Sequence, residues 1–241
     1  MSETFNKPTD GEMRKSGQAC VRPKDAATLV LIKKVNRKNC VLMGQRARGH
    51  KFMPDRYVFP GGRVDRADGY APQGKALKTR VTRHLEKAAT PHRARALAMA
   101  AIRETFEETG MILGNPVKNA DKPDRVSESW RPFIDAGFTP ALDQLEYLCR
   151  AVTPPYRPVR FNARFLVADG NRLEGDLGGT GELLYLDWIP IKDAMELHLP
   201  NITRRVLGDL RHVINEPEKF RRRKKSFLFH QVHGQHVFTE E

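Results

Sequence analysis

Residues 90–110, "TPHRARALAMAAIRETFEETG", constrain the fold most strongly, because they encode both ends of a long helix. Thr90 is a favourable N-cap, and Pro91 suits the first helical position, where no backbone donor is needed. Gly110 is a favourable C-cap, since glycine adopts the left-handed conformation at little cost. The segment therefore predicts one long, alanine-rich helix.

Charge is distributed unevenly around this predicted helix. Spacings of three and four place Glu104, Glu107 and Glu108 on one face. Like charges so arranged repel one another by roughly 0.5 kcal/mol per pair. They indicate either a solvent-exposed acidic helix or oxygen ligands for a hard cation such as Mg²⁺ or Mn²⁺. Spacing alone leaves both readings open. The opposite face is apolar and contains Met99, Ile102 and Phe106.

Composition indicates a globular protein with one main core. The chain has 241 residues, of which 39% are hydrophobic and 29% are charged. It contains no run of the roughly 18 apolar residues that a membrane span requires. The polar N-terminus lacks the apolar segment of a signal peptide, and three separated cysteines suit reduced thiols. We therefore expect a cytoplasmic protein without a membrane partner.

The formal net charge of +13 favours anionic partners, such as a phosphate-rich metabolite, nucleic acid or an acidic surface. Part of this charge lies in the run "KFRRRKK" at residues 219–225. Such a run is either a solvated tail or helix end, or a contact for nucleic acid.

The order of elements indicates an α/β fold with a mixed sheet. Strands are predicted at residues 26–32, 40–45, 146–152, 163–169 and 182–191, with a strand entering a glycine turn at 58–62. Helices are predicted at residues 75–89, 90–109 and 201–214, with short ones at 127–137 and 139–147. The expected organisation is a flexible segment at 1–25, one domain at 26–215 and a basic C-terminal tail at 216–241.

Two separated motifs carry a resemblance to a known family. Residues 103–111, "RETFEETGM", resemble the second half of the Nudix box, G-x5-E-x7-R-E-U-x-E-E-x-G-U, where U is a bulky aliphatic residue. The first half is "FPGG" at 59–62 followed by Asp68, which stands where the pattern has Glu. A longer spacer separates the halves, so the box is split by an insertion at residues 69–94.

A split box is similar to that of the coenzyme A diphosphatase-like branch of Nudix enzymes. Upstream of "FPGG", Leu42, Arg46 and Ala47 match a signature of coenzyme A-cleaving relatives, whereas Lys51 and Asp55 replace the expected Arg and Gly. The resemblance implies a Nudix-type α/β/α sandwich with a mixed β-sheet and a helical insertion.

The implied activity is that of a metal-dependent pyrophosphatase, which hydrolyses the P–O–P bond of a nucleoside diphosphate derivative with Mg²⁺ or Mn²⁺. Coenzyme A or acyl-CoA is the first expected substrate. ADP-ribose, a dinucleotide or a nucleotide sugar is the alternative. A different reading is a non-catalytic Nudix-fold binding module with an RNA-binding basic tail. The oligomeric state stays open, with a homodimer among the options.

The resemblance also implies roles for individual residues. Expected metal ligands are Glu104, Glu107, Glu108 and a carbonyl of the glycine turn at Gly62. Arg103 is expected to hold a glutamate in place, and the general base is expected among Glu107, Glu108 and Glu182, with Glu174 a weaker candidate. Expected phosphate-binding residues are Arg46, Lys51, Arg160 and Arg164. His233 and His236 are considered as a metal pair and given little weight.

Overall fold

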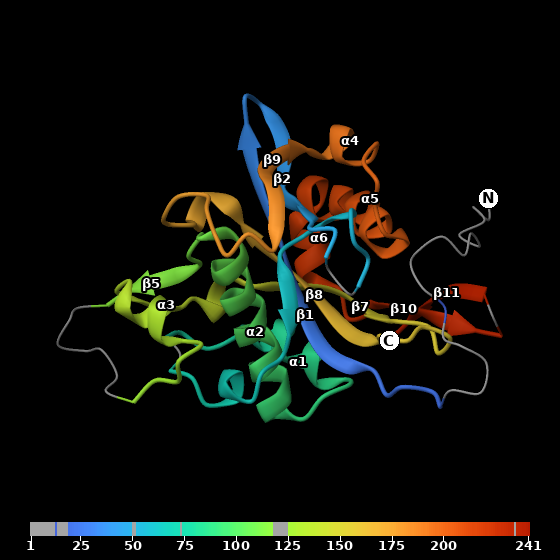
Figure 1. Cartoon of the computed structure of the whole chain (residues 1–241), viewed down its shortest axis with the longest axis horizontal. Helices are drawn as coiled ribbons and strands as arrows, with labels where there is room; N and C mark the ends of the chain where they lie inside the picture. Colours follow the sequence, from blue (N-terminus) through green and yellow to red (C-terminus); the bar gives the residue numbers. More distant parts are fainter. Residues whose placement is uncertain (1–12, 14–18, 50–51, 73, 118–124, 234) are drawn as a thin grey trace.

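A computed structural model describes residues 13, 19–49, 52–72, 74–117, 125–233 and 235–241. Its main element is a nine-stranded mixed sheet with the order β11-β10-β7-β8-β1-β2-β3, in which β4 also pairs with β1 and β9 with β2 (Figure 1). The pairs β1–β8 and β10–β7 are parallel, and the other pairs are antiparallel. The predicted mixed sheet is confirmed.

The strands of the main sheet are β1 (Lys24–Val35), β2 (Lys38–Arg46), β3 (Tyr57–Val58), β4 (Gly61–Arg63), β7 (Glu146–Val152), β8 (Phe161–Asp169), β9 (Leu183–Pro190), β10 (Phe227–Val232) and β11 (Gln235–Glu240). A second, two-stranded sheet consists of β5 (Gly114–Pro116) and β6 (Phe138–Pro140). The α-helices are α1 (Thr79–Glu86), α2 (Pro91–Thr109), α3 (Arg131–Asp135), α4 (Ile191–Ala194), α5 (Asn201–Asn215) and α6 (Pro217–Arg222). The 3₁₀ helices include η1 (Ala67–Gly69), η3 (Leu142–Gln144) and η4 (Gly170–Arg172).

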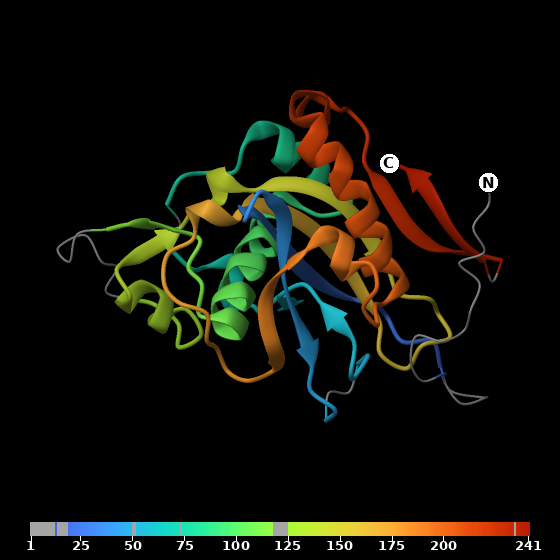
Figure 2. The ribbon, with the colours of Figure 1, turned by 90° about the horizontal axis from the view of Figure 1, so that it is seen from above.

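Helices cover both faces of the sheet, as Figures 1 and 2 show from two directions. Because side chains alternate along a strand, β1 contributes to two cores. Leu29 and Leu31 pack with α1, α2 and α3, whereas Val30 packs with α5 and α6 on the other face. This layering is the predicted α/β/α sandwich.

Helix α2 begins and ends as the sequence predicts. The side chain of Thr90 accepts a hydrogen bond from the backbone nitrogen of Arg93 at 3.3 Å, and Gly110 closes the helix with φ +73°. The glycine-rich loop at residues 175–181 then covers the last turn. Gly178 and Thr180 donate their backbone N–H groups to the carbonyls of Thr109 and Glu107. Helix C-terminal carbonyls that would lack partners are thereby satisfied.

Two local predictions differ from the structure. The helix expected at residues 75–89 is shortened to α1, because Lys78 is extended and does not begin a helix. The helix expected at 139–147 is wrong: this segment contains the end of β6, the 3₁₀ helix η3 and the start of β7. Pairing of β6 with β5 and of β7 with β8 supplies backbone hydrogen bonds that a short helix would otherwise have made.

The C-terminal segment 216–241, expected as a tail, adds α6, β10 and β11 to the domain. β10 lies parallel to β7, with Phe227 opposite Cys149, and Phe229 is buried in the core beneath α5. Within the run 219–225, Arg223 donates to the carbonyl of Leu148 at 2.8 Å, and Lys225 pairs with Glu240 at 2.6 Å. The run thus contacts its own domain, and the nucleic-acid hypothesis gains no support from it.

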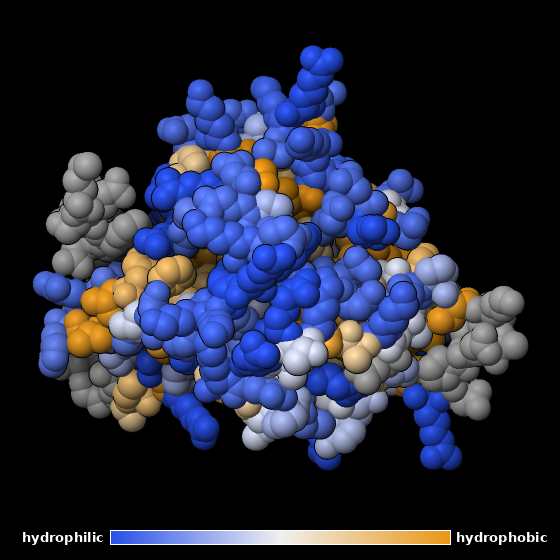
Figure 3. Space-filling model, turned by 180° about the vertical axis from the view of Figure 1, so that it is seen from behind, coloured by the Kyte–Doolittle hydropathy of each residue, from blue (hydrophilic) through white to orange (hydrophobic). Residues whose placement is uncertain are grey.

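The surface matches the charged composition. Hydrophilic residues cover most of the face seen in Figure 3, and apolar residues appear there in small groups. Among the described residues, no helix combines the length and apolar character needed to cross a membrane.

Candidate active site

The paired glycines of β4 form one side of the candidate site. Gly61 has φ +150°, and a Cβ atom on it would lie 2.5 Å from the carbonyl oxygen of Ala27 on the neighbouring strand. A Cβ atom on Gly62 would lie 2.3 Å from Oε2 of Glu104. Only glycine therefore allows the Glu104 carboxylate to rest directly against the backbone of this strand.

Glu108 joins the same strand from the last turns of α2. Its Oε2 accepts a hydrogen bond from the backbone nitrogen of Gly61 at 2.7 Å, and its side chain is buried. The glycine turn and the carboxylate helix, separated by some forty residues in the sequence, thus meet at one place.

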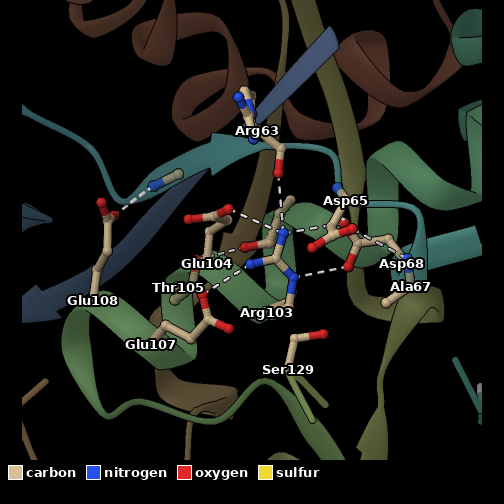
Figure 4. Close-up of polar contacts among 12 residues, drawn as sticks. Arg63, Asp65, Ala67, Asp68, Arg103, Glu104, Thr105, Glu107, Glu108 and Ser129 are labelled. Carbon is tan, nitrogen blue, oxygen red and sulfur yellow. Dashed lines mark hydrogen bonds and ion pairs between the residues drawn. The ribbon is translucent and has the colours of Figure 1, made fainter. Parts of the chain in front are cut away.

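Arg103 is a buried hub that connects the two halves of the motif (Figure 4). Its guanidinium pairs with Asp68 at 2.8 Å, with Glu104 at 3.0 Å and with Glu107 at 2.8 Å. It also donates to the carbonyl oxygen of Arg63 at 3.0 Å. One rigid fork therefore orients two carboxylates of α2 and fixes the end of β4.

Asp68 completes this hub and was not singled out as a site residue from the sequence. Its carboxylate is fully buried and accepts hydrogen bonds from Trp130 Nε1 at 3.0 Å and from the backbone nitrogen of Asp65 at 2.7 Å. Its position, where the box pattern has Glu, was the available signal. No sequence signal predicts the role of Trp130, because its hydrogen bond to Asp68 spans 62 residues of sequence.

The carboxylates are costly to ionise where they lie. Burial raises the pKa of Glu104 to about 7, and the charge of Glu107 adds to the rise against the opposing effect of Arg103. Burial raises the pKa of Glu108 to about 8, although the hydrogen bond from Gly61 acts in the opposite direction. Burial also raises the pKa of Glu107. A bound cation would stabilise the ionised carboxylates and so lower these raised pKa values.

Arg46 and Glu182 lie within electrostatic range of this cluster. Burial lowers the pKa of Arg46, whereas the charges of Glu108, Glu182 and Glu104 raise it. Glu182 is exposed, and its charge contributes to the raised pKa of both Glu107 and Glu108. The structure therefore brings these two predicted residues to the carboxylate helix.

An apolar chamber of about 160 Å³ opens next to β4. Gly61, Gly62 and Arg46 line one part of it. Aromatic side chains line much of the rest, namely Phe52, Phe59, Tyr156, Phe161, Phe165 and Phe229. The C-terminal strands contribute to the wall, since His236 of β11 lines the chamber and stacks on Phe229 with ring centroids 5.0 Å apart.

Other predicted residues lie elsewhere or have different partners. Arg160 donates to the carbonyls of Thr153 and Val21, at 2.9 and 2.7 Å. Arg164 is buried against Asp25, and Glu174 pairs through its backbone with Ile112. Lys51 lies outside the described residues. The geometry thus gives Arg160 and Arg164 structural partners, so we do not carry their expected phosphate contacts forward.

The donor set fits a hard divalent cation in its chemistry. Glu104 and Glu108 carry oxygen ligands, lie against the glycine strand and gain from neutralisation, as Mg²⁺ or Mn²⁺ sites require. In the described part of the chain, no group of three His, Cys, Asp or Glu side chains is already gathered as a metal cluster. Arg103 and Gly61 occupy the carboxylates instead, so a cation would have to replace some of these contacts.

The sequence is similar to that of a known protein. No family model matches the sequence. A Caenorhabditis elegans protein named as a nudix hydrolase is 30% identical over 185 residues, covering 72% of this chain and 53% of that protein. The chain thus spans about half the length of this curated relative.

One solved structure gives the fold. The crystal structure of a NUDIX hydrolase from Alicyclobacillus acidocaldarius has a TM-score of 0.63 and 29% identity, over 80% of this chain and 92% of that one. The NUDIX domain of Shewanella oneidensis NrtR, solved with ADP ribose, is more distant, with a TM-score of 0.46 and 13% identity over 80% and 88% of the two chains. The chain therefore has the Nudix fold, and its sequence and structural relatives support its membership of the Nudix hydrolase family.

Proposed function

We propose that this protein is a divalent-metal-dependent hydrolase that cleaves the P–O–P bond of a nucleoside diphosphate derivative. One observation carries the proposal: Glu104 and Glu108 converge on the Gly61–Gly62 strand, although the insertion separates them in sequence. A solvated acidic helix would have no need of glycines that admit its carboxylates to the backbone.

The residues of the candidate site then have separate roles in the reaction. Glu104, Glu107 and Glu108, with a carbonyl of the glycine turn, would hold Mg²⁺ or Mn²⁺. When bound, such an ion polarises phosphoryl oxygens and lowers the pKa of water. Arg103 orients Glu104 and Glu107 through its ion pairs. The nearest general-base candidates are Glu107, Glu108 and Glu182, whose charges interact.

Substrate binding extends from the carboxylates into the apolar chamber. Arg46 lies at their junction, because it lines the chamber and interacts electrostatically with Glu104 and Glu108. A guanidinium there suits a phosphate oxygen. The aromatic walls suit a ring or an apolar group attached to the diphosphate.

Coenzyme A or acyl-CoA is the substrate we propose first, on the partial match of the upstream signature around Arg46. ADP-ribose or a dinucleotide is the second candidate, because the aromatic walls of the chamber also suit a nucleobase. The test is release of nucleotide or phosphate from coenzyme A, ADP-ribose and NADH in the presence of Mg²⁺.

A pair of variants, one in the carboxylate cluster and one outside it, tests where the reaction takes place. Glu107→Gln should reduce turnover at least ~100-fold, as losses of key charge-stabilising groups do, while urea unfolding stays near that of the wild type. Glu128→Gln, at an exposed position outside the cluster, serves as the control. Retention of most activity by Glu107→Gln would place the essential carboxylate elsewhere.

A further inference from the structure

A second depression, of about 750 Å³, adjoins the carboxylate cluster and has a different character from the apolar chamber. Arg103 and Glu104 are among its lining residues, so it shares two residues with the candidate site. Four further cations line it, and we call it the basic cleft after them: Arg22, Lys24, Arg63 and Arg66.

The charges of the basic cleft do not balance. Its other arginines have ion-pair partners within the protein, since Arg93 pairs with Asp25 at 2.7 Å and Arg150 pairs with Glu241 at 2.5 Å. The four defining cations make no ion pair or side-chain hydrogen bond with any described residue. Asp65 is the one carboxylate lining the cleft that has no cationic partner among the described residues. A surplus of positive charge therefore faces the cleft.

These cations stand on backbone that the protein holds in place. At the N-terminal side, the backbone carbonyl oxygen of Arg160 accepts a hydrogen bond from the backbone nitrogen of Lys24 at 2.9 Å, and the Arg160 guanidinium donates to the Val21 carbonyl at 2.7 Å. At the other side, Arg103 donates to the carbonyl of Arg63 at 3.0 Å. The main chain is fixed while the charged ends remain exposed, which is a preorganised arrangement for an anion.

We propose that the basic cleft binds a phosphomonoester of the substrate, separate from the two phosphates of the bond that is cleaved. The proposal rests on the proposed function, because it concerns the same substrate. Arginine forks suit phosphate oxygens in pairs, and a dianionic phosphomonoester matches the surplus charge. The ionised carboxylate of Glu104, which also lines the cleft, repels anions and so favours a phosphate position nearer to the four cations. Nucleoside diphosphate derivatives that bear an additional phosphate would thus be selected over those that lack it.

The test compares coenzyme A with 3′-dephospho-coenzyme A, which differ by one phosphomonoester, in the presence of Mg²⁺. We expect the wild type to hydrolyse coenzyme A with the higher kcat/KM. The double variant Arg63→Gln/Arg66→Gln should lower kcat/KM for coenzyme A by roughly threefold to tenfold through KM, and leave 3′-dephospho-coenzyme A unchanged. Arg172→Gln is the matched control, since this exposed arginine follows the opposite end of β8 from the cleft. It should change neither value.

Binding without turnover separates this proposal from the proposed function. Adenosine 3′,5′-bisphosphate should bind the wild type more tightly than adenosine 5′-monophosphate in calorimetry, and the double variant should abolish the difference. If the double variant lowers kcat/KM equally for both coenzymes, or for neither, the basic cleft does not bind the phosphomonoester. The proposed hydrolase activity would stand in either case. If neither coenzyme is hydrolysed, the proposed function fails and the calorimetric difference alone decides whether the cleft binds phosphate.

Discussion

Arg103 and Arg164 are two buried arginines that organise different regions, and their charge balance differs. Arg103 pairs with three carboxylates, so its surroundings keep an excess of negative charge. Arg164 shares the single carboxylate of Asp25 with Arg93, so its surroundings keep an excess of positive charge. The number of carboxylate partners thus distinguishes Arg103, at the proposed metal site, from Arg164, whose partners are structural.

The two hubs also do different structural work. Arg103 joins β4, η1 and α2, which together carry the candidate site. Arg164 on β8 donates to the carbonyl of Ala88 at 2.8 Å, just beyond α1, and thereby fastens the predicted insertion to the sheet. The first hub sets the geometry of the site, whereas the second sets the position of the insertion.

The largest effect is expected at the anchor of the first hub. Asp68→Ala should lower the free energy of unfolding by ~3–5 kcal/mol, because it leaves the buried charge of Arg103 without its fully buried carboxylate partner. Asp68→Asn keeps the shape and should cost less. Urea unfolding measures both. A loss below ~1 kcal/mol for Asp68→Ala would mean that Glu104 and Glu107 suffice to neutralise Arg103.

Removal of the second arginine should cost less. Arg164→Met should destabilise the fold by ~2–3 kcal/mol, since Asp25 is only partly buried and keeps Arg93 as a partner. KM for the diphosphate substrate should stay within twofold of the wild type. Unchanged stability together with a raised KM would restore the expectation that Arg164 binds phosphate.

The insertion should also weaken in acid, through His84 of α1. Burial lowers the pKa of His84 to about 4, and the charges of Arg223 and Lys87 contribute. The unfolded chain takes up a proton near pH 6.5 and the folded chain does not, so stability falls as the pH drops below 6.5. The contribution of His84 to this loss between pH 7 and pH 5 should be ~2 kcal/mol, obtained as the difference between the wild type and a variant without the imidazole, because Glu104 and Glu108 contribute with the opposite sign. His84→Phe, which preserves stacking on Tyr147, should remove it in urea titrations at the two pH values.

The site hub should respond to pH in the opposite direction. Because the pKa values of Glu104 and Glu108 are raised in the folded state, the contribution of these groups to the stability of the fold is lost as the pH rises through about 7 and 8. Mg²⁺ should restore it, by ~1.4 kcal/mol at ten times its Kd, and more strongly at pH 8.5 than at pH 6, where protons compete.

Thermal unfolding with and without Mg²⁺ measures this last effect. The expected rise in Tm at pH 8.5 is ~3–6 °C. Glu108→Gln should reduce the rise, whereas Glu128→Gln should leave it unchanged. An equal rise at both pH values would show that the ion binds away from these carboxylates.

Much of the site was predictable because its signals are local. The start and end of α2 depend on hydrogen bonds and conformations within a few residues of Thr90 and Gly110. The common face of Glu104 and Glu108 follows from helical geometry alone. The glycine turn followed from the motif, and the structure adds why Gly62 is needed there: a Cβ atom would collide with Glu104.

The sequence by itself determined the long helix, its carboxylate face, most strands and the mixed α/β class, because each depends on periodicity or on neighbours along the chain. Only the tertiary structure decided which distant partners meet. Asp68 reaches Arg103 after the insertion returns, β10 pairs with β7 although a tail was expected, and Arg160 binds carbonyls where a phosphate was expected. Such pairings depend on how the sheet and its helices bring remote segments together, and no local pattern of residues records that closure.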